Sequence, residues 1–430
     1  MKKILKIFSL LFCAGLLFSC ENVRDNSVVP QRLSQKVKFE RDLSDAYRIA
    51  NEYATSLTTT RSGNSRQIAY DDTHYVTSES TRATNGLDTL YYIVNYEGNS
   101  GFAIIPRNKL LPDVVVLTEQ GNYNGEETEN ELFNMLMNGA KAYAANSTRK
   151  PDSITLKPQP QPQYADTMTF DTVAKILPKV TAQWGQGSPY NIFCITANNQ
   201  LAGCEAIAVG QIMSYYEYPT SIQLTYPNHD IPIQVLDWDV INNVPNHSHW
   251  ADECSNHFAL ARLIREIGEQ LNINYNDSLS IANDNNVREA LSYFGYSCSN
   301  VKDFSIYDVG NSLRNDGLVH FSAKKSPETD SYGHAMIFDG FIDIRCRYRV
   351  WEGPWLWPSN EPFPWVLIED NITTYKYVHC NLGYDGLSNG WYADGVINTA
   401  FCSHLDDNNN IYNDVEYIYS KKIITDIKPQ

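Results

Sequence analysis

Apolar residues recur along this chain in two patterned regions, a short N-terminal one and a longer C-terminal one. Across residues 43–53 they follow helical spacing, which predicts an amphipathic helix. Strand-like runs rich in Val, Ile and Tyr follow at 89–95, 101–105 and 113–117, and Gly, Asn or Pro separates them. We therefore predict a small α+β domain over residues 39–146.

A proline-rich stretch separates the two regions. Residues 147–179 contain the run Pro-Gln-Pro-Gln-Pro-Gln, and repeated proline favours an extended, exposed segment. Arg149 and Lys150 stand near its start and Lys179 at its end. Because proteolytic nicking concentrates in exposed linkers, we predict an activation cleavage between Arg149 and Lys179.

The region after the linker, residues 180–430, changes from helical to strand-like patterns. An apolar stripe begins at Cys204 and is ended by Pro219, which predicts a helix. Further helices are predicted at 256–271, 286–293 and 306–314, and strands at 318–323, 333–342, 345–351, 365–368, 375–382 and 390–397. Helices first and strands later in one core favour an α+β fold over a parallel α/β sheet.

The first residues, 1–19, have the composition of an export signal. Three lysines precede an apolar segment at 7–18 that is too short to span a bilayer, and Cys20 follows directly after the signal. This ending resembles the bacterial lipobox, which predicts lipidation of Cys20 and a tether at 20–38. An ordinary secretory signal with an incidental cysteine is the alternative. The expected location is outside the cytoplasm, lipid-anchored to a bacterial membrane or cell surface, with the second domain released when the linker is cut.

Charge and cysteine content limit the partners and cofactors. The 430 residues carry a formal net charge of −16, which argues against a nucleic-acid partner because phosphates would be repelled. Nine cysteines are present, and export permits disulfides, whose pairing the sequence leaves open. His247, His249 and His257 lie close together, but their spacing matches no metal site. No metal and no cofactor are expected.

Cys204 stands where a thiol becomes nucleophilic. A loop precedes it, a predicted helix follows it, and Gly203 leaves the approach open. A thiol at a helix N-terminus is close to the positive end of the helix dipole and to free backbone N–H groups, and both lower its pKa. The alternative is a buried, inert cysteine at the start of a core helix.

His334 is the candidate general base. It opens a predicted strand directly after Gly333, which leaves one face of the imidazole accessible. An imidazole with a pKa of about 6.5 suits a group that takes and returns a proton near neutral pH. A histidine whose ring is satisfied by backbone hydrogen bonds is the alternative.

Two amide side chains complete the candidate site. Gln186 lies in a Gly- and Pro-rich turn shortly before the nucleophile and is a candidate donor to an oxyanion. Asn381 ends a predicted strand at the start of a glycine-rich loop, where an amide can orient an imidazole. A structural turn and a hairpin loop are the alternatives.

In the order amide, cysteine, histidine and asparagine, these segments resemble the streptopain-type cysteine peptidases. The resemblance spans about residues 180–400 and is most specific at 203–206, 211–219, 186–191 and 333–340. It implies a papain-like α+β fold, a helical part plus an antiparallel sheet part, in which Cys204 is the nucleophile, His334 the base and Gln186 part of the oxyanion hole. Residues 39–146 are similar in pattern to the inhibitory pro-region of that family.

The chain departs from the family pattern at three positions. Leu382 and Tyr384 stand where the family usually has tryptophans, one of which shields the histidine from water. Glu205 follows the nucleophile directly, where a small or apolar residue is commoner. A carboxylate that faces the sulfur would raise the pKa of the thiol.

These observations predict a cysteine endopeptidase that is made as a lipoprotein zymogen. Its expected partners are protein or peptide substrates and its own pro-domain, which acts as inhibitor until the linker is cleaved. One alternative is a non-catalytic surface lipoprotein of the same fold that binds a peptide or a partner. Two others are an N-terminal domain that inhibits other proteases and a thiol-dependent amide transferase.

Overall fold

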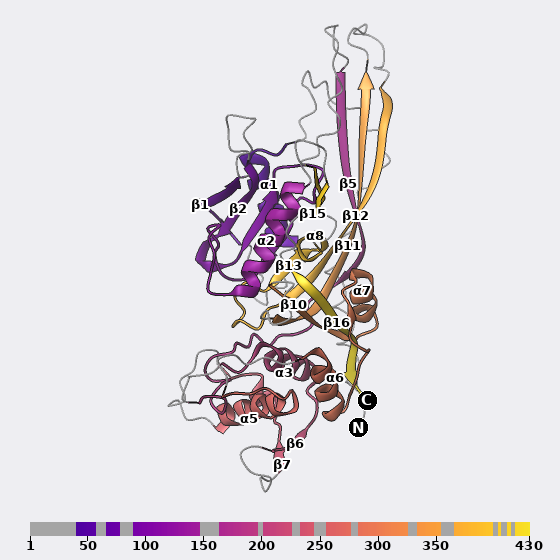
Figure 1. Ribbon diagram of the computed structural model, residues 1–430. Coiled ribbons are helices and arrows are strands. Elements are labelled where there is room, and N and C mark those ends of the chain that lie inside the picture. The colour runs from indigo at the N-terminus through magenta and orange to yellow at the C-terminus, as the bar shows by residue number, and fades with distance from the viewer. Residues whose placement is uncertain are drawn as a thin grey trace, which may run out of the picture. The chain divides into compact units, whose positions relative to one another are not determined.

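The computed structural model describes most of the chain (Figure 1). The described residues are 40–56, 66–77, 89–146, 163–196, 201–225, 233–244, 255–276, 283–325, 333–353, 365–398, 403–405, 411–413 and 418–430. They fall into two compact units, and the smaller one includes Tyr348–Asp370. The larger unit comprises Lys38–Thr155, Thr169–Arg347 and Asn371–Gln430, and it holds every candidate site residue after Cys20. Among the described helices, none combines the length and the apolar character needed to cross a bilayer.

The N-terminal region of the larger unit is a four-stranded antiparallel meander covered by two helices. Its elements are α1 (Leu43–Ser56), β1 (Ile68–Thr77), β2 (Thr89–Tyr96), η1 (Glu97–Asn99), β3 (Phe102–Pro106), β4 (Val116–Thr118) and α2 (Glu131–Asn146). Both helices pack on β2, and Ile49, Val94, Ile104 and Leu136 are fully buried between the layers. The helix and the three strands predicted from the sequence are confirmed, whereas β1 and α2 carried no pattern that we recognised.

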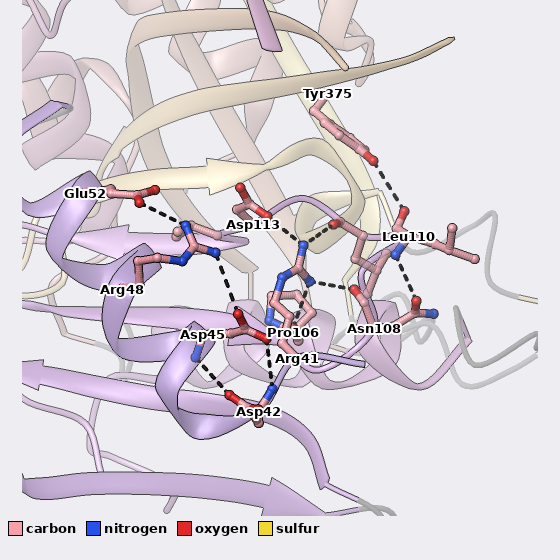
Figure 2. Close-up of polar contacts among 12 residues, drawn as sticks. Arg41, Asp42, Asp45, Arg48, Glu52, Pro106, Asn108, Leu110, Asp113 and Tyr375 are labelled. Atoms are coloured by element: carbon pink, nitrogen blue, oxygen red, sulfur yellow. Dashed lines mark hydrogen bonds and ion pairs between the residues drawn. The ribbon is translucent and has the colours of Figure 1, made fainter. Parts of the chain in front are cut away.

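A buried arginine fixes the entry of the chain into this domain (Figure 2). The guanidinium of Arg41 donates to the carbonyl oxygens of Pro106, Asn108 and Leu111 at 2.6–3.1 Å and to the carboxylate of Asp113 at 2.6 Å. A buried guanidinium is tolerated because its donors are satisfied by acceptors in this way. The loop between β3 and β4 is thereby held in one shape beneath the start of α1.

The C-terminal region begins with a helical part. Its elements are α3 (Cys204–Tyr216), β6 (Ser221–Gln223), β7 (Ile233–Val235), α4 (Trp238–Ile241), α5 (Ser255–Gln270) and α6 (Asp284–Tyr293). Helices α3, α5 and α6 contact one another (Figure 1), and α3 is buried almost throughout because apolar residues surround it. The helices predicted from the sequence at 204, 256–271 and 286–293 are confirmed with small shifts of their ends.

The sheet part follows. Its elements are β8 (Tyr296–Ser297), β9 (Lys302–Asp303), α7 (Ile306–Arg314), β10 (Leu318–Lys324), β11 (Gly333–Gly353), β12 (Val366–Asn381), β13 (Gly390–Ala393), α8 (Asp394–Ile397), β14 (Ser403–Leu405), β15 (Ile411–Asn413) and β16 (Tyr419–Pro429), and the earlier strand β5 (Gln163–Ile176) pairs with β11. Every strand pair whose register is known is antiparallel, which confirms the α+β class.

The sheet differs from the sequence prediction in four places. The strands predicted at 333–342 and 345–351 are one continuous strand, β11, and those predicted at 365–368 and 375–382 are one strand, β12. The strand predicted at 390–397 ends at Ala393, after which α8 begins. Part of the predicted linker, Gln163–Ile176, is the strand β5.

One sheet joins the two regions. Strand β4 of the N-terminal region pairs antiparallel with β13 of the C-terminal region, and Thr118, Leu117 and Val116 lie opposite Gly390, Trp391 and Tyr392. Helix α2 contacts α8 on the same side. The N-terminal domain is therefore bound to the C-terminal domain by backbone hydrogen bonds as well as by side-chain packing.

Candidate active site

Cys204 is the first residue of α3, as the sequence predicted. Gly203 precedes it with φ of 95°, a conformation that favours glycine, and Cys204 as a whole residue is partly exposed. The thiol donates a hydrogen bond of 2.9 Å to Oε2 of Glu205. Burial and the negative charge of Glu205 raise the pKa of Cys204 well above its usual value, and the backbone amide of Ala335 partly opposes this.

Glu205 does face the sulfur, which is the arrangement that the sequence flagged as unfavourable for a thiolate. It is 5% exposed, in the first turn of α3. Burial raises the pKa of Glu205 to about 7, the hydrogen bond from Cys204 opposes the shift, and Asp284 adds to it. The thiol in this structure is therefore a hydrogen-bond donor to a carboxylate rather than the partner of an imidazole.

His334 is the second residue of β11 and lies opposite Ala323 of β10. Its Nε2 lies 3.3 Å from Oε2 of Glu131, the first residue of α2 in the N-terminal domain. Burial lowers the pKa of His334, and the contact with Glu131 partly offsets this. The next residue, Ala335, has its backbone N–H bonded to the sulfur of Cys204, so the start of α3 lies against the start of β11.

Glu131 also has a cationic neighbour. Lys325 Nζ lies 3.6 Å from its Oε1, on the opposite side from the imidazole. Burial alone would raise the pKa of Glu131, but the hydrogen bond with His334 and the charge of Lys325 lower it below its usual value. The carboxylate is thus held ionised between two groups of the C-terminal domain.

Gln186 lies in the turn that the sequence singled out, and the turn is tied to the nucleophile. The backbone N–H of Ala202 donates to the carbonyl oxygen of Gln186 at 3.0 Å, two residues before Cys204. The side chain of Gln211 on α3 accepts from the N–H of Trp184 at 3.2 Å. The turn and the start of α3 therefore form one rigid assembly.

Asn381 is buried at the end of β12. Its Nδ2 donates to the carbonyl oxygen of Ala182 at 2.8 Å, and its Oδ1 accepts from the N–H of Gly383 at 3.2 Å. The first bond joins the end of β12 to the segment before the Gln186 turn, and the second is local to the loop after β12. An orienting role toward His334 stays a prediction. The next residue, Leu382, is 3% exposed and apolar.

A second histidine lies in the sheet, and sequence reasoning gave it no role. Nδ1 of His379 on β12 lies 2.6 Å from Oδ1 of Asp339 on β11. Its Nε2 lies 3.6 Å from Oε1 of Glu119. Burial lowers the pKa of His379, but the two carboxylates outweigh this and raise it to about 10. Trp391 covers the imidazole edge to face.

Glu131, Glu119 and Asp339 were all missed by sequence reasoning, because each acts through a partner distant in sequence. The five cysteines that the structure describes are free thiols: Cys194, Cys204, Cys298, Cys346 and Cys380. Within the described residues, no group of three or more His, Cys, Asp or Glu side chains is arranged to hold a metal ion. His247, His249 and the predicted lipidation residue Cys20 lie outside the described residues.

Comparisons with known proteins agree with this geometry. A model described as the Peptidase C10 family matches residues 184–392, and one described as Spi protease inhibitor matches residues 32–143. The chain belongs to the streptopain-type cysteine peptidases. It carries the N-terminal pro-region of that family.

The relatives of this streptopain-type peptidase are distant. Streptopain of Streptococcus pyogenes is 24% identical over 298 residues, which are 60% of this chain and 70% of streptopain. Among solved structures, a prointerpain A fragment of Prevotella intermedia is 17% identical with a TM-score of 0.48, covering 85% of this chain and 99% of the fragment. Active interpain A of the same organism is 18% identical with a TM-score of 0.36, covering 59% of this chain and 95% of its own.

The family assignment confirms two predictions from the sequence. The streptopain-type peptidase is a cysteine-type endopeptidase, and its N-terminal domain is the pro-region. Its pro-region is of the inhibitor type, which supports protein substrates and inhibition by the pro-domain. The roles of single residues in catalysis are proposed from the geometry of the site.

Proposed function

We propose that this chain is the latent form of a cysteine endopeptidase in which Cys204 is the nucleophile and His334 the general base. The observation that carries the proposal is the position of Cys204 at the start of α3, with the backbone N–H of Ala335, the residue after His334, at its sulfur. A thiol at a helix N-terminus beside a histidine at a strand end is the arrangement that nucleophilic thiol chemistry requires.

The reaction would proceed by acyl transfer. Cys204 passes its proton to His334, and the thiolate attacks the peptide carbonyl carbon. The oxyanion accepts hydrogen bonds from Gln186 and from the backbone N–H of Cys204. His334 then protonates the leaving amine and activates the water that hydrolyses the acyl enzyme. The rigid link between the Gln186 turn and α3 supports this role for Gln186.

The latent state follows from two hydrogen bonds that compete with the catalytic pair. His334 is engaged by Glu131 of the pro-region, and the thiol of Cys204 is engaged by Glu205. Neither group is therefore free to form the thiolate–imidazolium pair. Removal of the pro-region would free His334, and cleavage in the segment between Arg149 and Lys179 would permit that removal.

Further contacts keep the pro-region in place until cleavage. Tyr375 and Tyr377 of β12 donate to the carbonyl oxygens of Leu110 and Val114 at 3.3 and 2.8 Å, and Figure 2 shows the first of these. Strand β4 is paired with β13 on the other side. The inhibitory domain therefore binds as part of the same sheet that carries His334.

We also propose that the chain is exported and anchored through lipid on Cys20, with residues 1–19 removed as a signal. The basic and apolar segments before Cys20 support this reading. Because the lipid would be on the pro-region side of the linker, cleavage would release the mature protease from the membrane. Metabolic labelling with a radioactive fatty acid tests this: label should appear in the wild-type chain and be absent from Cys20→Ala.

Self-processing tests the catalytic assignment. Purified chain lacking residues 1–19 should trim itself in the segment 147–179, and Cys204→Ser should not, as followed by intact mass. Cys298→Ser, which removes another partly buried thiol, is the matched control and should process like the wild type. Processing by Cys204→Ser would overturn the assignment. Failure of both proteins to process or to cleave casein after a trace of trypsin would favour a non-catalytic binding protein.

A further inference from the structure

A cluster of ionisable and polar groups lies behind the proposed nucleophile. Glu205 of α3 bonds to the thiol, and the pKa of its carboxyl is raised by burial and, to a smaller degree, by Asp284 at the start of α6. Asp284 in turn accepts a short hydrogen bond from Ser322 of β10. His320, two residues earlier on β10, is 1% exposed. The cluster connects three elements directly beneath Cys204.

Among the described residues, the charged groups that face Glu205 include no cation. Burial lowers the pKa of His320 to about 4, so this imidazole is neutral at neutral pH, and its Nε2 has no hydrogen-bond partner in the structure. Asp284 and Ser322 supply a second carboxylate and a hydroxyl. His334, whose neighbour Ala335 contacts the sulfur, is held by Glu131. Ionised Glu205 is therefore stabilised chiefly by the thiol proton itself.

We propose that Glu205 is a positioning residue for the nucleophile: it holds the proton of Cys204 and makes thiolate formation depend on the protonation state of its own carboxyl. The inference rests on the proposed function of Cys204. When Glu205 is neutral, its O–H can donate to the thiolate and stabilise it. When Glu205 is ionised, the thiol donates to the carboxylate, and a thiolate would face a like charge at hydrogen-bond distance.

The proton balance is simple. The thiol proton goes to His334 when that imidazole is free, and Glu205 keeps or loses its own proton without taking part in bond making. The thiol is therefore the stronger acid while Glu205 is protonated, that is, below the pKa of Glu205, which burial raises to about 7. Above that pH the thiol becomes a weaker acid, because two negative charges would have to share one buried site.

The rate of alkylation of Cys204 by iodoacetamide, measured from pH 5 to 9.5 on the full chain by mass spectrometry of the Cys204 peptide, tests this. In the wild type the rate should rise with pH, level off near pH 7 and rise again only at the alkaline end. In Glu205→Gln it should continue to rise through pH 8.5 and exceed the wild-type rate there by roughly tenfold or more, because a like charge shifts a pKa by one to three units. A Glu205→Gln profile that overlays the wild type overturns the proposal.

Two further variants make the test specific. Glu289→Gln removes an exposed carboxylate from α6 and should leave the profile unchanged. Asp284→Asn removes a charge that adds, after burial, to the raised pKa of Glu205, so the levelling-off should lie at or below the wild-type pH; a levelling-off that moves to higher pH overturns the proposal even if Glu205→Gln does not fold. Alkylation measures the reactivity of the thiol and not turnover. Self-processing by Cys204→Ser would therefore overturn the catalytic assignment without contradicting the alkylation result.

Discussion

Two histidines of the protease domain each face a carboxylate of the pro-region, and their surroundings differ. His334 is 22% exposed at the mouth of β11, and its partner Glu131 is 45% exposed. His379 is 4% exposed inside the sheet, where Asp339 is fully buried on one side and Glu119 is 22% exposed on the other. The pKa of His334 is lowered by burial, whereas the carboxylates raise the pKa of His379 to about 10.

The difference separates a contact that can be released from one that holds the fold. A buried histidine between two carboxylates stays protonated in the folded protein over the physiological pH range, so the contact itself does not depend on a proton gained or lost there. A partly exposed histidine with a lowered pKa gains its proton only on the acid side of the ordinary value of about 6.5. The pro-region is thus fixed at His379 and adjustable at His334, the residue that the proposed chemistry needs.

The largest effect is expected at the buried pair. Asp339→Ala leaves protonated His379 without its closest partner and the N–H of Val180 without its acceptor. Removing one member of a buried ion pair costs on the order of 3–5 kcal/mol, so we expect a loss of that size in the free energy of unfolding, measured by urea denaturation. Asp316→Ala breaks the exposed pair with Lys179 and should cost less than about 1 kcal/mol. Equal costs would mean that His379 is not charged in the fold.

A smaller loss of stability is expected when Glu119, the pro-region partner of the same histidine, is changed. Glu119→Gln keeps the shape of the side chain and removes the charge 3.6 Å from Nε2 of His379. We expect a loss of about 1 kcal/mol in the free energy of unfolding of the full chain, in the range of partly screened charge pairs.

The pH dependence of the loss of stability in Glu119→Gln tests whether His379 is protonated. His379 has a raised pKa, so its stabilisation is complete below the ordinary pKa of about 6.5 and is lost as pH rises toward 10. The cost of Glu119→Gln should therefore be equal at pH 6 and pH 7.5, where His379 is protonated in both proteins. A cost that disappears between those two values would contradict the raised pKa.

The elements that the sequence predicted are those whose pattern is set by burial. Helix α3 and strands β2, β3 and β10 have almost every side chain buried, so their apolar residues follow the local geometry. The outer half of β12 and residues 169–173 of β5 are mostly exposed, and their strand form depends on pairing with β11 rather than on an apolar face. Sequence patterning therefore read part of this sheet as linker or as separate strands.

The residues of the candidate site also divide into those that the sequence could identify and those that it could not. Cys204, His334 and Gln186 could be singled out because each stands next to a glycine at the predicted end of an element. Glu131 could not, because it contacts His334 across 203 positions of sequence and only the docking of two domains brings the two together. Glu205 was flagged by its position after the nucleophile, and its side-chain direction, which the sequence does not fix, decides what it does.

The smallest effect on stability, and the most direct effect on activation, is expected at the releasable contact. Glu131→Gln should change the free energy of unfolding by less than about 1 kcal/mol, because the carboxylate is half exposed. It should nevertheless shorten the half-time of self-processing at pH 7.5 by up to about fivefold, the rate equivalent of that energy, because His334 loses the acceptor that holds it. Glu129→Gln, an exposed neighbour two residues earlier, is the control and should process like the wild type.

The sign of the pH effect follows from the two shifts at this contact. The pKa of Glu131 is lowered despite its partial burial, so its contribution is present above the ordinary carboxyl pKa of about 4.5 and is lost as pH falls through the lowered value. Burial also lowers the pKa of His334, so protonating it below about pH 6.5 opposes the native arrangement. The contact itself is strengthened when His334 is protonated, because Glu131 raises the pKa of His334 against the effect of burial, and it is lost when Glu131 is protonated. The advantage of Glu131→Gln over the wild type should therefore be kept or grow from pH 7.5 to 5 and shrink below about pH 4.5; an advantage that disappears between pH 7.5 and 5 would show that Glu131 restrains activation by some route other than its charge.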